Sequence, residues 1–179
     1  MQAYLKKHGP AFSDHRIKVD WQVEGRVVTM EFQVQKRIGP PWQTDEVFTG
    51  DWSKNWGLWN KDVVEAFLQL RQNPEDKSAP YLEIQISPLN QPFSLIVTEP
   101  RNTFFAPKAL EYKSEVTLTE KLWTTKLEVT VPEEVVGDIL FGGFFACLGA
   151  STREYYALNP NPEMNPDFHR RELFLSLVE

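Results

Sequence analysis

Apolar and polar residues alternate strictly over two neighbouring segments near the start of the chain. Residues 17–24 carry apolar side chains at the odd positions, and residues 28–34 carry them at the even positions. A period of two is typical of a strand with one buried face. Because Glu24-Gly25-Arg26 joins the two segments, the pattern predicts a β-hairpin.

The same kind of pattern recurs at short spacing, with turn residues between the segments. Further strands are predicted at Asp62–Leu70, Tyr81–Ser87, Phe93–Thr98, Tyr112–Leu118, Leu122–Val131, Phe144–Ala150 and Leu173–Val178. Only residues 132–136 suggest a helical turn, because a proline stands at its first position. The prediction is an all-β fold, an antiparallel β-sandwich with at most one short helix. Residues 1–14 are expected to form an N-terminal extension ahead of one sandwich domain over residues 15–179.

The predicted strand at residues 62–70 follows a loop rich in tryptophan. Trp52, Trp56 and Trp59 lie among polar residues without a steady period. Flat rings stack well on sugars or other planar ligands, since they supply contact area at little cost in conformational entropy. The alternative is that these rings only seal one end of the core.

Two glutamates lie on the non-core faces of predicted strands. In residues 63–70 the even positions are apolar and Glu65 falls on the other face, which predicts a half-buried strand. Glu83 is placed in the same way within residues 81–86. If the strands are neighbours, the two carboxylates lie close together. They could accept hydrogen bonds from a ligand, pair with nearby Arg or Lys at the surface, or form the carboxylate pair of a glycoside hydrolase.

Composition and charge narrow the function classes. The chain has 179 residues, 41% of them hydrophobic and 25% charged, which is typical of a globular domain. A net charge of −6 argues against a nucleic-acid-binding surface and is more compatible with a neutral or cationic ligand. Cys147, the single cysteine, cannot form a disulfide within the chain and is expected to be buried.

No apolar run is long enough for a membrane-spanning helix. The first residues also lack the apolar segment of a secretory signal peptide. The sequence as written is therefore expected to be cytoplasmic, or periplasmic or secreted if a leader was removed.

Five motifs follow one another along the chain: Gly57-Leu58-Trp59, Asp62–Phe67, Tyr81–Pro88, Arg153–Leu158 and Pro166–His169. In this order they resemble family 9 carbohydrate-binding modules and their DOMON-like bacterial relatives. The resemblance covers roughly residues 15 to 179 and implies a β-sandwich that binds a carbohydrate without catalysis. It implies Trp56 or Trp59 as an aromatic wall, Glu65 and Glu83 as acceptors, Arg153 as a donor, and Tyr156 or Phe168 as a second wall.

The chain departs from this pattern at Leu158, where relatives usually have a Trp, and at Cys147-Leu148-Gly149. These departures motivate a second hypothesis, a structural or interaction domain that has lost sugar binding. Calcium, which some relatives bind, would need oxygen ligands from several loops. Haem, bound by some DOMON domains, could be proposed on His169 with Met30 or Met164. No cofactor is expected from the residues themselves, because no zinc-site spacing and no nucleophile motif occurs.

Overall fold

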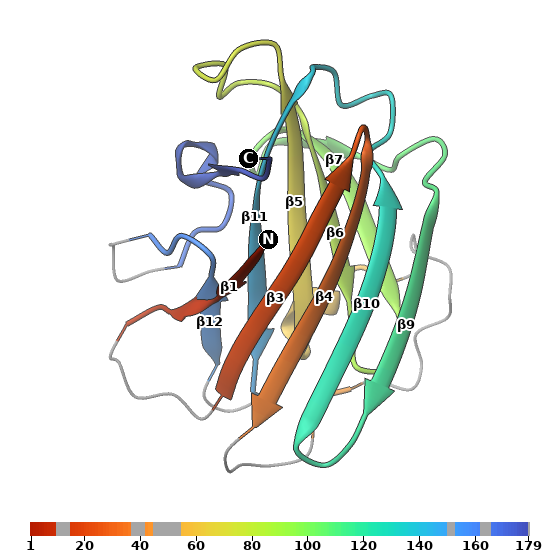
Figure 1. Cartoon of the computed structure of the whole chain (residues 1–179), viewed down its shortest axis with the longest axis vertical. Helices are drawn as coiled ribbons and strands as arrows, with labels where there is room; N and C mark the ends of the chain where they lie inside the picture. Colours follow the sequence, from red (N-terminus) through yellow and green to blue (C-terminus); the bar gives the residue numbers. More distant parts are fainter. Residues whose placement is uncertain (10–14, 37–41, 45–54, 150–152, 162–165, 179) are drawn as a thin grey trace.

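The chain folds into two antiparallel β-sheets packed face to face (Figure 1). The computed structural model describes residues 1–9, 15–36, 42–44, 55–149, 153–161 and 166–178. Within these residues there is no α-helix, and the only helical turns are the 3-10 turns η2 (Leu58–Asn60) and η3 (Arg171–Leu173). The predicted all-β sandwich is therefore confirmed.

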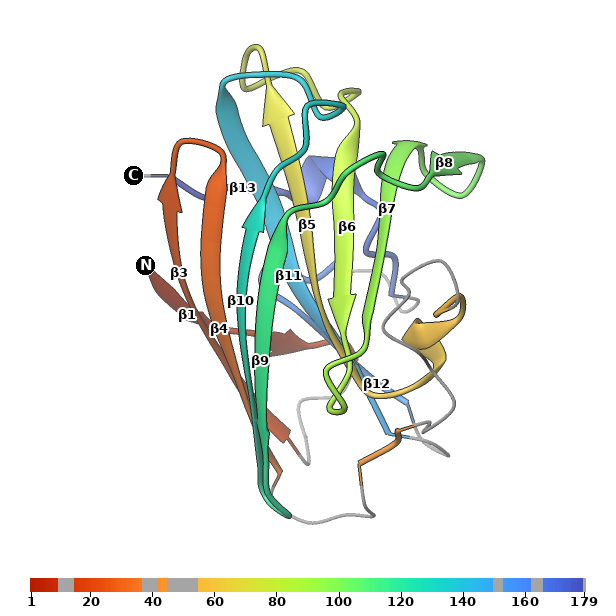
Figure 2. The ribbon, with the colours of Figure 1, turned by 90° about the vertical axis from the view of Figure 1, so that its right-hand side faces the viewer.

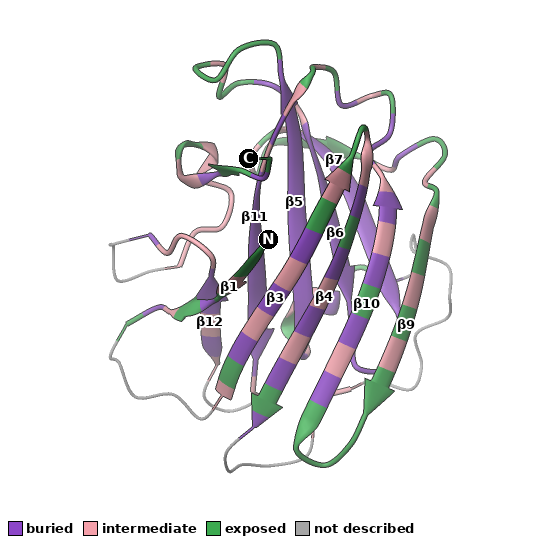
Figure 3. Cartoon of the chain, in the orientation of Figure 1, coloured by how far each residue is buried: buried purple, intermediate pink, exposed green. Residues whose placement is uncertain are grey.

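The smaller sheet has the strand order β1-β3-β4-β10-β9. Its strands are β1 (Gln2–Tyr4), β3 (His15–Glu24), β4 (Val27–Lys36), β9 (Tyr112–Leu118) and β10 (Leu122–Thr130). The predicted hairpin is formed by β3 and β4, with Gly25 at a φ of 59° in its turn. Figure 3 shows the alternation on this sheet, with buried positions separated by partly or fully exposed ones.

The larger sheet has the order β2-β12-β11-β5-β6-β7-β8, and β13 pairs with β11 outside this path. Its strands are β2 (Lys6–Lys7), β5 (Val63–Arg71), β6 (Tyr81–Ile86), β7 (Pro92–Glu99), β8 (Thr103–Phe105), β11 (Ile139–Leu148), β12 (Glu154–Ala157) and β13 (Leu175–Ser176). β5 lies between β11 and β6, so it occupies the middle of the sheet.

Apolar side chains from both sheets fill the space between the layers. Phe32 of β4 and Phe144 of β11 meet edge to face with ring centroids 5.8 Å apart, and Trp123 of β10 is fully buried. A second apolar cluster lies on the opposite face of the larger sheet, around Phe67, Phe93 and Phe145. Two cores therefore share the larger sheet, and the second core positions the candidate site.

The expectation of a half-buried strand at residues 62–70 was wrong. Every residue of β5 is buried (Figure 3), including Glu65 and Gln69. The turn η2 lies on the side of the larger sheet away from the smaller sheet, and β8 extends on that same side from the edge of the larger sheet (Figure 2). Loops cover the outer face of β5, which the alternating pattern had predicted to be exposed to solvent.

The first residues do not form an extension ahead of the sandwich. β1 pairs with β3 in the smaller sheet, and β2 pairs with β12 in the larger one. Leu5, between them, is 7% exposed and belongs to the main core. The segment was misread because its strands are only three and two residues long, too short to show a period.

Candidate functional site

A pocket of about 720 Å³ opens on the outer face of the larger sheet. Its floor comes from β5, β6, β7 and β11, and its walls come from η2, β8, β12 and the segment before η3. It is lined by Trp56, Trp59, Asn60, Glu65, Phe67, Glu83, Gln85, Leu95, Val97, Arg101, Phe104, Cys147, Arg153, Tyr155, Pro166, Asp167, Phe168 and His169. This volume suits a small organic ligand.

Glu65 and Glu83 lie side by side on the pocket floor. Glu65 pairs across the strands with Gln85, so Glu83 occupies the diagonal position on β6. Glu65 is 3% exposed and Glu83 is 5% exposed, which excludes the alternative of two glutamates at the solvated surface. The structure thus brings together the two carboxyls that the alternation pattern singled out.

Few protein groups compensate these carboxyls. The Cys147 thiol donates to Glu65 over 3.5 Å, and the Gln85 amide donates to Glu83 over 2.7 Å. Among the described residues, neither glutamate has an ion pair with Lys, Arg or His. Arg153 is near enough to favour the charged form of Glu65 without contacting it.

Burial raises the pKa of both carboxyls. For Glu65 the loss of hydration is the largest cause, and repulsion from Glu83 adds to it. For Glu83 burial is again the largest cause, and the hydrogen bond from Gln85 offsets only part of the rise in pKa. Two neighbouring carboxyls that are both buried do not both ionise readily, so near neutral pH the pair retains a proton.

The loop that carries Trp56 and Trp59 is held in place by its neighbouring residues. Gly57 takes a left-handed φ of 88°, which turns the chain between Trp56 and Trp59. Leu58 is fully buried in the second core, and the Asn55 amide donates to the Pro92 carbonyl of β7. The loop is therefore held by packing and hydrogen bonds while its rings face the pocket.

Aromatic rings surround the pocket mouth. Trp56 is 56% exposed and contacts Trp59 and Phe104, with ring centroids 5.1 and 5.4 Å apart. On the other side, Phe168 stacks on Phe145 at 4.4 Å. Trp52, the third tryptophan of the predicted loop, lies outside the described residues.

Arg153 lines the pocket but holds its wall together. Its guanidinium donates to the backbone carbonyls of Gly149, Trp59 and Lys61. These bonds join η2, the residue after it and the residue after β11 to the residue before β12. The predicted role as a free donor is therefore wrong for those N–H groups, and Arg153 positions Trp59.

Tyr156 was wrongly assigned to the site. Its ring is 2% exposed in the core between the sheets, and its hydroxyl donates to Glu154. Tyr155 lines the pocket instead, because it pairs with Cys147 on the outer face of β11 and β12. The sequence Tyr155-Tyr156 alone does not reveal which ring faces outward.

Several pocket residues were missed. Gln85 falls on the same face as Glu83, so the alternation within β6 could have found it. Phe104 and Arg101 lie on and before β8, a three-residue strand without a recognisable period. Asp167 lies within the predicted Pro166–His169 motif, at hydrogen-bonding distance of 3.2 Å from Arg101.

The haem ligands proposed from sequence do not come together. Met30 is buried in the core between the sheets, whereas His169 lines the outer pocket and its Nδ1 lies 2.5 Å from the Tyr81 hydroxyl. Met164 lies outside the described residues. Over the part of the chain that is described, no three His, Cys, Asp or Glu side chains are placed to hold a metal ion. Calcium binding stays a prediction.

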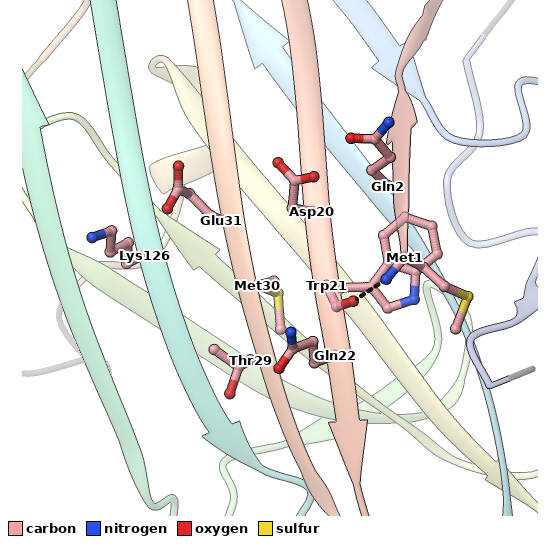
Figure 4. A pocket seen from close by; sticks show the side chains of 9 residues that line it. All are labelled: Met1, Gln2, Asp20, Trp21, Gln22, Thr29, Met30, Glu31 and Lys126. Carbon is pink, nitrogen blue, oxygen red and sulfur yellow. Dashed lines mark hydrogen bonds between the residues drawn. The ribbon is translucent and has the colours of Figure 1, made fainter.

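A second, shallower hollow lies on the outer face of the smaller sheet (Figure 4). Its volume is about 530 Å³, and Asp20, Glu31 and Lys126 project from separate strands around it. It lacks the ring of aromatic side chains and the buried carboxyls of the larger pocket. The larger pocket is therefore the better candidate site.

Fold and site together define a β-sandwich that carries an aromatic pocket with an acidic floor on its larger sheet. No protein-family model matches the chain. It is similar to the UPF0462 protein C4orf33 homolog of Rattus norvegicus, with 33% identity over 126 residues, 65% of this chain and 58% of the rat protein. The Mus musculus homolog is 31% identical over 125 residues, covering 65% of this chain and 60% of the mouse protein.

The match thus spans less than two thirds of these relatives' own length. Their names specify neither a ligand nor a reaction, and both come from rodents, whereas the sequence resemblance pointed to bacterial modules. No described helix is long and apolar enough to cross a membrane.

Proposed function

We propose that the protein is a non-catalytic binding module for a carbohydrate or a related polyhydroxylated ligand, held in the pocket on the larger sheet. The observation that carries this proposal is the meeting of exposed rings and buried carboxyls in one open cavity. Trp56 and Trp59 line the same pocket as Glu65 and Glu83. The resemblance to family 9 carbohydrate-binding modules supports the same conclusion.

The two kinds of side chain have complementary uses. The flat faces of Trp56, Trp59 and Phe104 suit the C–H faces of a sugar ring. Glu65 and Glu83 offer oxygens that can accept from sugar hydroxyls, and a protonated carboxyl can also donate. A pocket with apolar walls and a few convergent polar groups is typical of small-ligand sites.

Titration with a panel of mono- and oligosaccharides, with and without calcium, tests the proposal. Binding is measured by calorimetry and by tryptophan fluorescence, which should change because Trp56 and Trp59 lie in the pocket. No heat and no fluorescence change with any saccharide would contradict it.

Phe104 and Phe105 provide a matched pair of variants on β8. Both are 41% exposed, but only Phe104 lines the pocket. Phe104→Ala should weaken binding by about 1 kcal/mol, the usual contribution of an aromatic contact. Phe105→Ala should leave the affinity unchanged, and equal losses would place the ligand elsewhere.

The carboxyl pair also favours glycoside hydrolysis as a second candidate. Two carboxyls flank the scissile bond in most such enzymes. A pair that retains one proton near neutral pH matches the acid and the carboxylate that a hydrolase needs, so the ionisation of the pair does not separate hydrolysis from binding. Chromatography of the titrated oligosaccharides separates the two functions, since cleavage products would assign the pair to hydrolysis.

The structural or interaction domain suggested by the departures from the family pattern is the third candidate. Exposed Trp56 and Phe104, together with Phe105 on the opposite face of β8, give this edge of the larger sheet an apolar surface. If this surface binds another protein, both Phe105→Ala and Phe104→Ala should weaken the binding of that protein. No saccharide should bind in that case.

A further inference from the structure

We infer that the ligand of this pocket carries an ammonium group, and that within the proposed function the preferred ligand is an amino sugar rather than a neutral sugar. The inference rests on the proposed function and adds the charge of the ligand. It is carried by the charge balance of the lining, by the aromatic walls and by an unpartnered acceptor on the floor.

The charged groups of the pocket leave its two carboxyls without a cation in direct contact. The lining contains three acidic residues and two arginines. Arg101 pairs with Asp167 at the rim over 3.2 Å. Arg153 donates to three backbone carbonyls. Arg153 acts on Glu65 only from beyond contact distance, so among the described residues no cation contacts either Glu65 or Glu83.

The walls suit the same charge. Trp56, Trp59, Phe104, Tyr155 and Phe168 line the cavity above the carboxyls. The faces of aromatic rings are negative, so a desolvated ammonium among them is stabilised by cation–π attraction. A neutral hydroxyl gains no such term. Rings and carboxyls together thus favour a cation over its neutral analogue.

An unpartnered acceptor lies beside the carboxyls. Gln85 is 1% exposed and directly opposite Glu65 on the neighbouring strand. Its amide nitrogen donates to Glu83, while its carbonyl oxygen has no hydrogen-bond partner among the residues that the structure describes. Buried acceptors almost always have a hydrogen-bond partner, because leaving one unpaired costs free energy. An ammonium carries three donors and no acceptor, which matches a floor made of acceptors.

Glucosamine, glucose and N-acetylglucosamine are matched probes, because they differ only in the substituent at one ring position. Calorimetric titration of the full chain at pH 7 should give an affinity for glucosamine at least roughly tenfold above that for the other two. Equal affinities would overturn the inference and leave the proposed function standing. If none of the three binds, both fail for these monosaccharides.

Variants that remove a carboxyl from the pocket floor test whether Glu65 and Glu83 cause the preference for glucosamine. Glu65→Gln and Glu83→Gln keep the side-chain shape, so the preference for glucosamine over glucose should fall to roughly twofold or less. Glu128→Gln, at an exposed ion pair with Lys113 on the other sheet, serves as the control and should keep the full preference. A preference that survives in both floor variants would place the ammonium elsewhere. Should these variants fail to fold, the comparison of the three sugars on the unmodified chain still decides the question.

Discussion

At the scale of single residues, Arg153 connects stability with binding. Lysine has one ammonium in place of the planar guanidinium and cannot reproduce a fork of bonds to three carbonyls. We expect Arg153→Lys to lower the free energy of unfolding by about 1 kcal/mol. It should also weaken saccharide binding several-fold, because the Trp59 carbonyl loses its anchor. Urea unfolding and calorimetric titration measure the two effects.

Arg26 is the matched control for this prediction. It also donates to three carbonyls, those of Val131, Pro132 and Val135, but far from the pocket. Arg26→Lys should destabilise the fold to a similar extent and leave the affinity unchanged. If both variants weaken binding equally, the effect of Arg153 is general loosening of the fold rather than positioning of Trp59.

Site residues could be predicted from the sequence where the alternation shows which face of a strand is apolar. Glu65 and Glu83 were found because their neighbours on the core face are all apolar. Tyr156 was misassigned because facing depends on the register of β12 against β11, which places Tyr155 outward. The carbonyl partners of Arg153 come from segments up to 94 residues away, so no local pattern could indicate its role.

At the scale of elements, the crossing from β1 to β2 fastens both sheets. Leu5 lies at the crossing and packs in the main core, whereas the adjacent Tyr4 is 49% exposed. We expect Leu5→Ala to lower the free energy of unfolding by roughly 2 to 3 kcal/mol, the cost of a buried leucine and the cavity it leaves. Urea titration followed by circular dichroism measures it.

Tyr4→Ala is the neighbouring control and should cost less than about 1 kcal/mol. If Leu5→Ala costs no more than Tyr4→Ala, the N-terminal residues are dispensable and the strands they form contribute little to the fold.

Elements with one solvated face were predictable, and short or doubly covered ones were not. The β3–β4 hairpin has a clear period because its outer face meets water. β11 begins at Ile139, five residues before the predicted start. The prediction started too late because the glycines at 142 and 143 interrupt the apolar pattern of the strand. A Cβ at Gly142 would lie 2.3 Å from the Phe67 carbonyl oxygen, so the strand needs glycine there. The predicted helical turn after Pro132 is a hydrogen-bonded turn without a helix.

At the scale of the whole molecule, the buried ionisable groups set how stability depends on pH. Burial raises the pKa of Glu65 and Glu83 above 4.5, with repulsion from Glu83 adding to the rise for Glu65, and burial raises the pKa of Asp62 above 3.8. Their contribution to stability is complete below these values and is lost as the pH rises through the higher folded pKa values. The other groups that face the pair are Cys147, Arg153, Tyr81 and, at the rim, Asp167, Arg101 and His169. Of these, burial raises the pKa of Cys147 and Tyr81, so their contribution is lost only in more alkaline solution.

Two groups act in the opposite direction. Burial alone would raise the pKa of Glu154, but hydrogen bonds from Lys7, Tyr156 and His15 lower it to about 2. Burial lowers the pKa of His169 below 6.5. A lowered pKa contributes stability that is present above the unfolded value and lost as the pH falls. Acid therefore weakens the fold through Glu154 and His169, and base weakens it through the pocket floor.

The free energy of unfolding should consequently be greatest near pH 4 to 5, where Glu154 is ionised and the floor carboxyls still hold their protons, and it should fall by roughly 2 kcal/mol or more from there to pH 8. Urea titrations at pH 4 to 9 measure this profile. Glu65→Gln with Glu83→Gln removes the ionising groups, so the decline toward pH 8 should become shallower and the maximum should move toward neutral pH. Glu128→Gln, which removes an exposed carboxyl, should leave the profile unchanged. A stability that rises steadily from pH 5 to 8 in the unmodified chain would mean that the floor carboxyls ionise without cost, and that the pocket supplies the positive charge for which a ligand is proposed here.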